Sequence, residues 1–272
     1  MAEPTSPANR PLPVELIVQV FSLIIAILLV HAIYVTLVRP NADAILREDA
    51  LRMQEEEDFV ARRSLWVLVR DYEQEACFIL MIWAMAIMVT KGGVSARERK
   101  LLQMDLVPVS GGMKILPEDT REYARHIQAL PEAVHRFLLP RALLTALHRF
   151  HSTSSIQDVS TAVHTMCESE SDRLESELSM VRYIAWAIPS IGFIGTVRGI
   201  GEALAQAHRA VEGDIAGVTQ SLGVAFNSTF IALMLSIVLM FALHQLQLHQ
   251  ERLVFDTESY CDEHLISHLR VH

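Results

Sequence analysis

Four long apolar segments constrain this chain more than any other feature of its sequence. They are residues 14–38, 76–90, 181–205 and 221–243, and the second becomes longer if Leu65–Val69 extend its helix. A helix of about 20 apolar residues crosses the hydrocarbon core of a bilayer. Hydrophobic residues make up 51% of the chain and gather in these segments, so the pattern predicts an all-α integral membrane protein with four transmembrane helices.

Charge and cysteine usage exclude several classes of protein. The formal net charge is -9 and no basic stripe is present, which argues against a nucleic-acid partner. Cys77, Cys167 and Cys261 are odd in number and far apart, so we predict neither a disulfide framework nor a zinc site. The sequence contains no phosphate-loop GK[ST], no HExxH and no arranged Ser-His-Asp set, and we therefore expect no enzyme activity, no metal site and no cofactor.

The basic residues beside the apolar segments predict which side of the membrane each connection occupies. Lys91, Arg97, Arg99 and Lys100 follow the second segment directly. The positive-inside rule then places residues 91–180 in the cytoplasm, together with the two termini, 1–13 and 244–272, and it places 39–75 and 206–220 outside. The outer segment 39–75 carries six arginines against this rule, but its ten acidic residues indicate a solvated helix with many salt bridges.

Local signals predict a helical cytoplasmic domain between the second and third membrane helices. We expect a hairpin around Gly111-Gly112 and, from about Ile156, one helix through the third apolar segment. Another helix should run from about Asp214 through the fourth segment and past Arg252 into the cytoplasm. The remaining boundary signals are Gly92-Gly93 at the end of the second helix, Pro117 at a helix start, Pro131 and Pro140 at later boundaries, and a capping cluster at Ser152–Ser155.

A stripe of small residues follows one face of each of the last two apolar segments. Steps of three and four residues select Gly192, Thr196, Gly199 and Ala203 in the third segment, and Ala225, Thr229, Ala232 and Ser236 in the fourth. Such stripes allow helix backbones to approach closely, with hydroxyls bonding across the interface. Alternatively they line a polar pathway, in which the threonines offer oxygen ligands to a proton, a water or a cation. The residues alone leave both interpretations open.

Two sequence strings in these segments resemble those of a known family. The string GFIGTVRGI at 192–200, which follows Pro189, resembles the signature of the MotA/TolQ/ExbB proton channel family, and AFNSTFIAL at 225–233 is similar to the family's last-helix motif. The resemblance covers about residues 156–265. The first two helices match only in number, like the four-helix arrangement of flagellar stator subunits.

The resemblance implies a subunit of a rotary motor in the bacterial inner membrane. Family members assemble as a pentamer around a dimer of a single-span protein such as MotB, TolR or ExbD, whose transmembrane aspartate takes up the proton or sodium ion. Ion flow turns the pentamer and drives envelope transport, motility or defence. The family does no covalent chemistry.

Particular residues take roles under this resemblance. Thr196 and Thr229 match the family's pore-lining threonines, and we assign the nearby Asn227, Ser228 and Ser236 to the same ion pathway. The residues expected to form the pore face and to pack the helices are Pro189, Gly192, Gly195, Gly199, Ala203, Ala225 and Ala232.

Three positions depart from the family pattern. Val224 stands where some biopolymer-transport members carry a glutamate, and Asn227 where some relatives carry an acidic residue. Arg198 is unusual within the signature and points about 200° away from Thr196 around the helix. We expect it near the outer interface, where Glu202 at i+4 makes a candidate charge pair.

Two functions follow from these patterns. The first is an ion-conducting subunit of an inner-membrane motor that carries protons or sodium ions. The second is a non-conducting membrane scaffold that uses its small-residue stripes only for helix packing.

Overall fold

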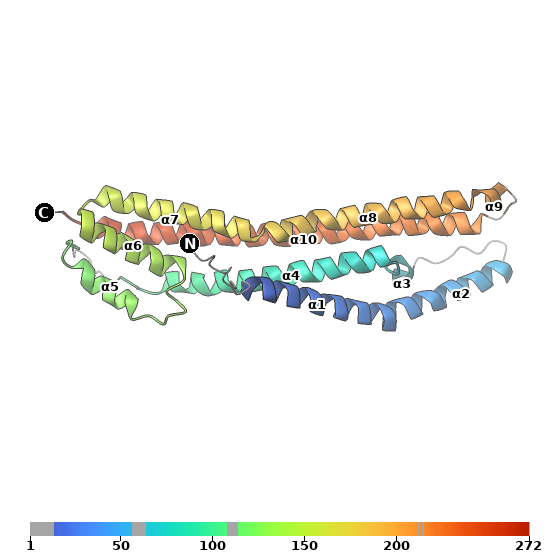
Figure 1. The fold of residues 1–272 in the computed structure, drawn as a ribbon, viewed down its shortest axis with the longest axis horizontal. Coiled ribbons are helices and arrows are strands. Elements are labelled where there is room, and N and C mark those ends of the chain that lie inside the picture. Colours follow the sequence, from blue (N-terminus) through green and yellow to red (C-terminus); the bar gives the residue numbers. More distant parts are fainter. Residues whose placement is uncertain (1–13, 56–63, 108–113, 212, 214, 272) are drawn as a thin grey trace, which may run out of the picture. The chain divides into compact units, whose positions relative to one another are not determined.

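The computed structural model describes residues 14–55, 64–107, 114–211, 213 and 215–271. The described part of the chain is helical apart from loops and one isolated bridge between Ile115 and Leu269. It contains four helices long and apolar enough to cross a membrane, which confirms the predicted all-α membrane class (Figure 1). The hairpin expected around Gly111-Gly112 lies outside the described residues.

Two compact units make up the chain. Unit 1 comprises the chain up to residue 87 together with 183–240, and unit 2 comprises 88–182 with 241 onward. Unit 2 therefore contains most of the segments for which the basic residues predict a cytoplasmic position.

Unit 1 is built from apolar helices that expose many large side chains and bury small residues at close helix contacts. The side chains of Phe21, Phe193 and Phe230 are exposed, whereas Ala84 and Ala232 are fully buried. This distribution suits helices whose surroundings are lipid, because lipid-facing side chains can be large while close helix contacts need small ones. Its elements are α1 (Val14–Ile33), a π-helical turn (Tyr34–Val38), α2 (Arg39–Glu55), α3 (Leu65–Leu68), the first part of α4 (Tyr72–Arg99), most of α8 (Ser179–Ala205), α9 (Ala207–Val211) and the first half of α10 (Ala216–His264).

The bounds of α4 differ from the prediction at both ends. Leu65–Val69 do not extend it, because α4 starts at Tyr72, where the backbone N–H of Asp71 donates to Gln74 Oε1 at 2.7 Å. Gly92-Gly93 do not end it either, since α4 continues to Arg99. A Cβ at Gly92 would lie 3.4 Å from the side chain of Leu246 on α10, so this glycine serves close packing inside a continuous helix.

Unit 2 contains a helical hairpin whose turn follows from two serines. Its elements are the rest of α4, a 3-10 turn (Lys100–Gln103), α5 (Thr120–Gln128), α6 (Leu138–Thr153), α7 (Ile156–Glu177), the remainder of α8 and α10, and a 3-10 turn (Ile266–His268). Ser154 ends α6 in the left-handed region with φ of 50°, and Ser155 caps α7 by accepting from the N–H of Asp158. The predicted capping cluster is thus confirmed, and it makes α6 and α7 antiparallel neighbours.

The expected single helix from Ile156 through the third apolar segment is interrupted once. α7 ends at Glu177, and the N–H of Leu178 bonds to the carbonyls of Glu175 and Ser176 before α8 begins at Ser179. This tightening of the last turn is common at helix ends. The expected long last helix is confirmed, because α10 runs without a break from Ala216 to His264.

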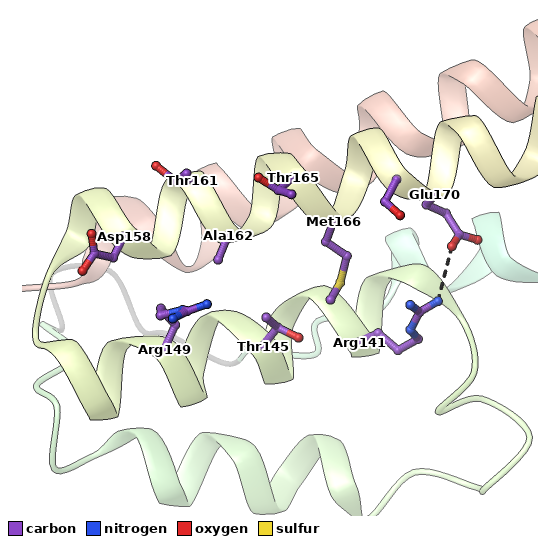
Figure 2. Close-up of a pocket in the computed structure, with 10 residues that line it drawn as sticks. Arg141, Thr145, Arg149, Asp158, Thr161, Ala162, Thr165, Met166 and Glu170 are labelled. Carbon is purple, nitrogen blue, oxygen red and sulfur yellow. Dashed lines mark hydrogen bonds and ion pairs between the residues drawn. The ribbon is translucent and has the colours of Figure 1, made fainter.

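A polar groove with a cavity volume of about 530 Å³ lies between α6 and α7 (Figure 2). Its lining carries both charge signs, with Arg149 and Asp158 at one end and the paired Arg141 and Glu170 at the other. Threonines line the stretch between them. Most of the lining residues are charged or polar, which differs from the mainly hydrophobic and aromatic lining of most small-molecule sites.

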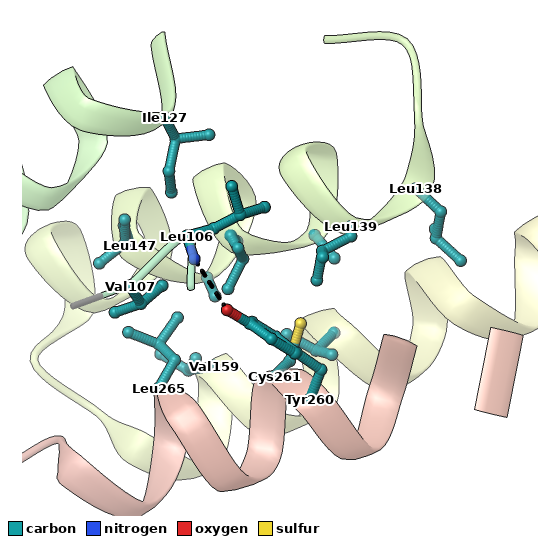
Figure 3. Close-up of a cluster of buried hydrophobic side chains, with 14 of the residues drawn as sticks. Leu106, Val107, Ile127, Leu138, Leu139, Leu147, Val159, Tyr260, Cys261 and Leu265 are labelled. Atoms are coloured by element: carbon teal, nitrogen blue, oxygen red, sulfur yellow. Dashed lines mark hydrogen bonds between the residues drawn. The ribbon is translucent and has the colours of Figure 1, made fainter. Parts of the chain in front are cut away.

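The core of unit 2 joins α5, α6, α7 and the end of α10 (Figure 3). Leu139, Phe150 and Cys261 within it are fully buried. Tyr260 enters this core with its hydroxyl satisfied, since the oxygen accepts from the N–H of Leu106 at 3.0 Å and the O–H donates to the carbonyl of Met104 at 3.1 Å. The tyrosine thus joins the loop after α4 to α10.

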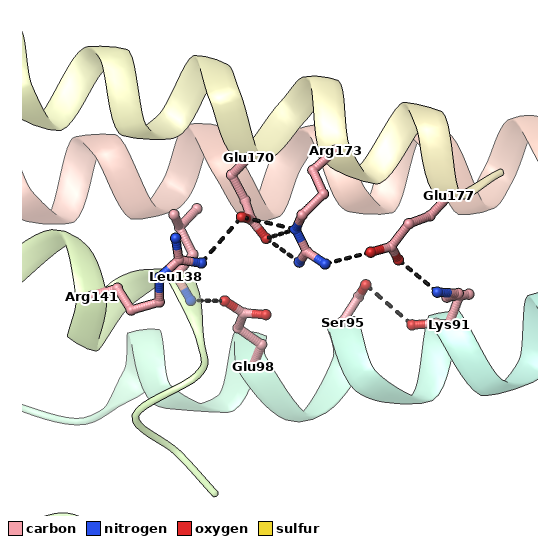
Figure 4. A network of polar contacts seen from close by, with 8 residues as sticks. All are labelled: Lys91, Ser95, Glu98, Leu138, Arg141, Glu170, Arg173 and Glu177. Atoms are coloured by element: carbon pink, nitrogen blue, oxygen red, sulfur yellow. Dashed lines mark hydrogen bonds and ion pairs between the residues drawn. The ribbon is translucent and has the colours of Figure 1, made fainter. Parts of the chain in front are cut away.

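A chain of charged side chains ties α4, α6 and α7 together within unit 2 (Figure 4). Lys91 Nζ lies 2.7 Å from Glu177 on α7, Arg173 bonds to both Glu170 and Glu177, and Glu98 accepts the N–H of Leu138 at the start of α6. The Glu98 carboxylate thereby satisfies a backbone donor that a helix N-terminus leaves unpaired.

Candidate functional site

The small residues of α8 and α10 face each other within unit 1. A Cβ at Gly192 would lie 2.4 Å from the Cβ of Ala232, and one at Gly199 would lie 2.8 Å from the Cβ of Ala225. Atoms of real side chains do not approach so closely, so only glycine fits at these two positions. We call this contact between α8 and α10 the seam. Figure 1 shows the two helices side by side.

The two predicted threonines meet at the seam. Thr196 Oγ1 lies 3.0 Å from the carbonyl oxygen of Ala225, Thr229 Oγ1 lies 3.1 Å from that of Gly192, and the two hydroxyls also contact each other. Thr196 Oγ1 also lies 3.4 Å from the carbonyl oxygen of Gly192 on its own helix. Each hydroxyl has one proton, so two protons serve four contacts. The result is a cluster of four oxygen atoms, from two hydroxyls and two carbonyls, in the middle of the seam. Oxygen atoms of these kinds are ligands for hard cations.

Ser236 forms a second polar contact along the seam, with a carbonyl that Pro189 leaves without its usual partner. Proline has no N–H, so the carbonyl of Ala185 lacks its usual partner four residues later in α8. Ser236 Oγ on α10 donates to that carbonyl at 3.2 Å. A hydroxyl from the opposite helix thus replaces the missing helix hydrogen bond, as is common in membrane helices.

The other two predicted pathway residues differ in their surroundings. Ser228 is 1% exposed, and its Oγ has no hydrogen-bond partner among the described residues. It lies against Gly195, where an added Cβ would be 2.5 Å from Ser228 Cβ. Asn227 is half-exposed on α10. The structure therefore brings Ser228 into the seam beside the threonines, while Asn227 lies at its margin.

Arg198 binds two carboxylates, of which the sequence indicated only one. Its Nη1 donates to Glu202 at 2.9 Å, and its Nε and Nη2 donate to the two carboxylate oxygens of Glu73 at 2.6 and 2.9 Å. Glu73 lies in the first turn of α4, outside the predicted site. A charge in an apolar membrane segment needs a partner of opposite sign. Arg198 in the third apolar segment therefore indicates that a carboxylate pairs with it, and the structure finds that carboxylate just before the second apolar segment.

A further charged cluster joins α1, α2 and α4. The Glu75 side chain is 7% exposed and binds both Arg39 and His31, whose Nδ1 lies 2.7 Å from Glu75 Oε1. Arg39 also lies over the ring of Tyr72, 4.3 Å from its centroid. Arg70 binds Asp43 at 3.2 Å in the same unit. These contacts are of the kind expected for a helical segment with many salt bridges.

Comparison of the sequence with models of protein families finds a match. The model of the MotA/TolQ/ExbB proton channel family matches residues 135–259, which include α8 and most of α10. This match supports the resemblance to the MotA/TolQ/ExbB proton channel family over residues 135–259. The seam and its threonine pair lie inside the matched part, whereas Glu73 and Glu75 lie outside it. Comparison with curated proteins and with solved structures finds no match.

The match to the MotA/TolQ/ExbB family indicates the class of function. Together with the four apolar helices, it implies a multi-pass membrane protein and a proton-channel-type subunit of an ion-driven system, and proteins of this family form complexes with partner proteins.

Proposed function

We propose that this chain conducts protons or sodium ions as one subunit of a motor in the bacterial inner membrane. In this proposal five copies, as in the family pattern, surround a dimer of a single-span protein of the MotB, TolR or ExbD kind. Ion flow past the threonine pair turns the subunits about that partner and does mechanical work. Both termini lie in the cytoplasm.

The observation that carries this proposal is the oxygen cluster formed by Thr196 and Thr229. Its hydroxyl and carbonyl oxygens can coordinate a passing sodium ion or hydrogen-bond to a hydrated proton, and they lie on helices whose outward side chains are large and apolar. Neither small-residue stripe contains a carboxylate. Glu73 approaches the seam at Gly195, but Arg198 neutralises it. An ion at membrane depth needs a counter-charge, so the proposal assigns that charge to an aspartate of the partner.

Ion flux in liposomes tests the proposal. The chain and its copurified single-span partner are reconstituted together, and proton and then sodium flux is measured for the wild type, Thr196→Val and Thr229→Val. Valine keeps the shape of threonine and removes the hydroxyl, so both variants should lose most of the flux while the complex keeps its mass. Thr196→Ser, which restores a hydroxyl, should conduct.

A matched serine on the same helix provides the control. Ser190 is exposed, and its hydroxyl bonds to the carbonyl of Trp186 on its own helix. Ser190→Ala should therefore conduct like the wild type. Unchanged flux in both valine variants would remove the threonine pair from the pathway.

The scaffold function keeps one observation in its favour. Each threonine hydroxyl reaches a backbone carbonyl of the opposite helix inside a single chain, which is a packing contact in its own right. If an intact complex carries neither protons nor sodium ions and the valine variants only lower its denaturation midpoint, the scaffold function is the better account.

A further inference from the structure

Three helices of unit 1 meet at Gly195. A Cβ at this glycine would lie 2.8 Å from Ser228 Oγ on α10 and 3.3 Å from Glu73 Cγ on α4. The missing side chain thus leaves a notch on α8 that both neighbouring helices occupy. Gly195 immediately precedes Thr196, so any displacement of α8 at the notch also moves the threonine.

The Glu73 side chain is held in this notch by a two-pronged ion pair. Both of its carboxylate oxygens accept from Arg198, which lies one turn further along α8 on the same side as Gly195. The Glu73 side chain is 13% exposed and that of Arg198 is 39% exposed. Two parallel bonds between a guanidinium and a carboxylate fix orientation as well as distance. The pair therefore restrains α4 and α8 against both sliding and rotation.

A second contact between the same helices supports a fixed placement. Cys77, one turn after Glu73 on α4, is fully buried, and its Sγ lies 3.6 Å from the carbonyl oxygen of Ile188 on α8. Glu202, in contrast, pairs with Arg198 from α8 itself. It can neutralise charge but cannot join α8 to another helix.

We propose that the Glu73–Arg198 ion pair positions α8 against α10 so that Thr196 meets Thr229, which makes Arg198 and Glu73 positioning residues of the ion pathway. The effect on flux rests on the proposed function, whereas the effect on the threonine contact does not. The pair works through the notch at Gly195, because the same point of α8 receives Glu73 from α4 and Ser228 from α10.

Ion flux provides the first test, on the reconstituted complex. Arg198→Lys keeps the positive charge but loses the two parallel N–H donors of the guanidinium. Glu73→Gln keeps the shape of the side chain but loses its negative charge. Both should lower flux about tenfold or more, since small misplacements of reacting groups carry penalties of this size, with the mass of the complex unchanged. Glu202→Gln is the matched control and should stay within about twofold of the wild type, as expected for an exposed pair of little energetic value. Wild-type flux in Arg198→Lys would overturn the proposal.

Coupling of denaturation midpoints provides a second test that needs no ion flux. Thr196→Val, Arg198→Lys and the double variant are denatured in the same detergent. If Arg198 positions the threonine pair, the shift in midpoint caused by Thr196→Val should be at most about half as large in the Arg198→Lys background as in the wild type. The reason is that the stability effects of two coupled residues do not add. Ser190→Ala should add independently to Arg198→Lys. Additive shifts for Thr196 and Arg198 would overturn the positioning role even if the wild type conducts no ion, and an absence of wild-type flux with non-additive shifts would overturn only the proposed function.

Discussion

A single methyl group added at Gly192 tests the seam most directly. In Gly192→Ala the new Cβ would lie 2.4 Å from the Cβ of Ala232 and 3.3 Å from the Cα of Thr229. Carbon atoms prefer a separation of about 3.5–4.0 Å, and neither Ala232 Cβ nor a backbone atom can turn aside. The helices must therefore move apart by roughly 1 Å at this level to restore normal contact.

The cost of that movement can be worked out against a matched glycine. Overpacking costs about 1–3 kcal/mol, and stretching the two threonine–carbonyl bonds across the seam adds roughly 1 kcal/mol at the typical membrane value for such bonds. Alanine gains about 1 kcal/mol over glycine in helix propensity. Gly201→Ala on the same helix should have the same gain without the cost, because nothing lies within 4 Å of its added Cβ. The propensity gain cancels between the two variants, so their stabilities should differ by about 2–4 kcal/mol.

Reversible denaturation in mixed micelles measures this difference. Both variants are compared with the wild type at equal protein concentration, and the amount of each variant in membranes is recorded as a second measure. Gly192→Ala should unfold at lower denaturant than the wild type, and Gly201→Ala at equal or higher denaturant. Equal midpoints for the two alanine variants would refute the close approach of α8 and α10.

Two further predictions concern unit 2. Burial raises the pKa of the Glu170 carboxyl, but the hydrogen bonds and positive charge of Arg173 outweigh burial, so the net pKa lies below the ordinary value. A carboxyl whose pKa is lowered by folding stabilises the fold at pH values above its pKa in the unfolded state. This stabilisation should disappear as the pH falls below about 4. Thermal unfolding followed by circular dichroism at pH 7 and at about pH 3 should show the loss, and Arg173→Gln should show less of it. Tyr260→Phe leaves the buried N–H of Leu106 without its partner and should cost about 1–3 kcal/mol in chemical denaturation, whereas the half-buried Tyr123→Phe should cost less.

Periodicity in the sequence was sufficient to find the membrane helices and the two small-residue faces that meet in the seam. The spacing of Gly192, Thr196 and Gly199 predicts a shared face, and the structure places all three toward α10. Such a prediction works because residues three and four apart are neighbours on any helix, whatever packs against it. The capping serines at the end of α6 were predictable for the same reason, since Ser155 acts on the N–H of Asp158 only three residues away.

Contacts between distant segments were not predictable in this way. Glu202 was found as a partner of Arg198 because it lies at i+4, but Glu73 is 125 positions away and no local pattern joins the two. The prediction for the glycines of α4 was wrong for a related reason. Gly92 was predicted to end a helix, whereas in the structure it lies inside α4 and allows the side chain of Leu246 on α10 to pack closely. Tertiary packing decides between these meanings of a glycine.

The seam also shows why packing and conduction need not be separate functions of this chain. The hydroxyls of Thr196, Thr229 and Ser236 all reach a backbone carbonyl of the opposite helix. An ion or water that bound the threonine pair would have to replace one of these interhelical bonds. Its binding would then weaken the contact between α8 and α10, and its release would restore that contact. Under the proposed function, each passing ion would therefore change how tightly the two helices are held, which is the kind of coupling that a motor subunit requires.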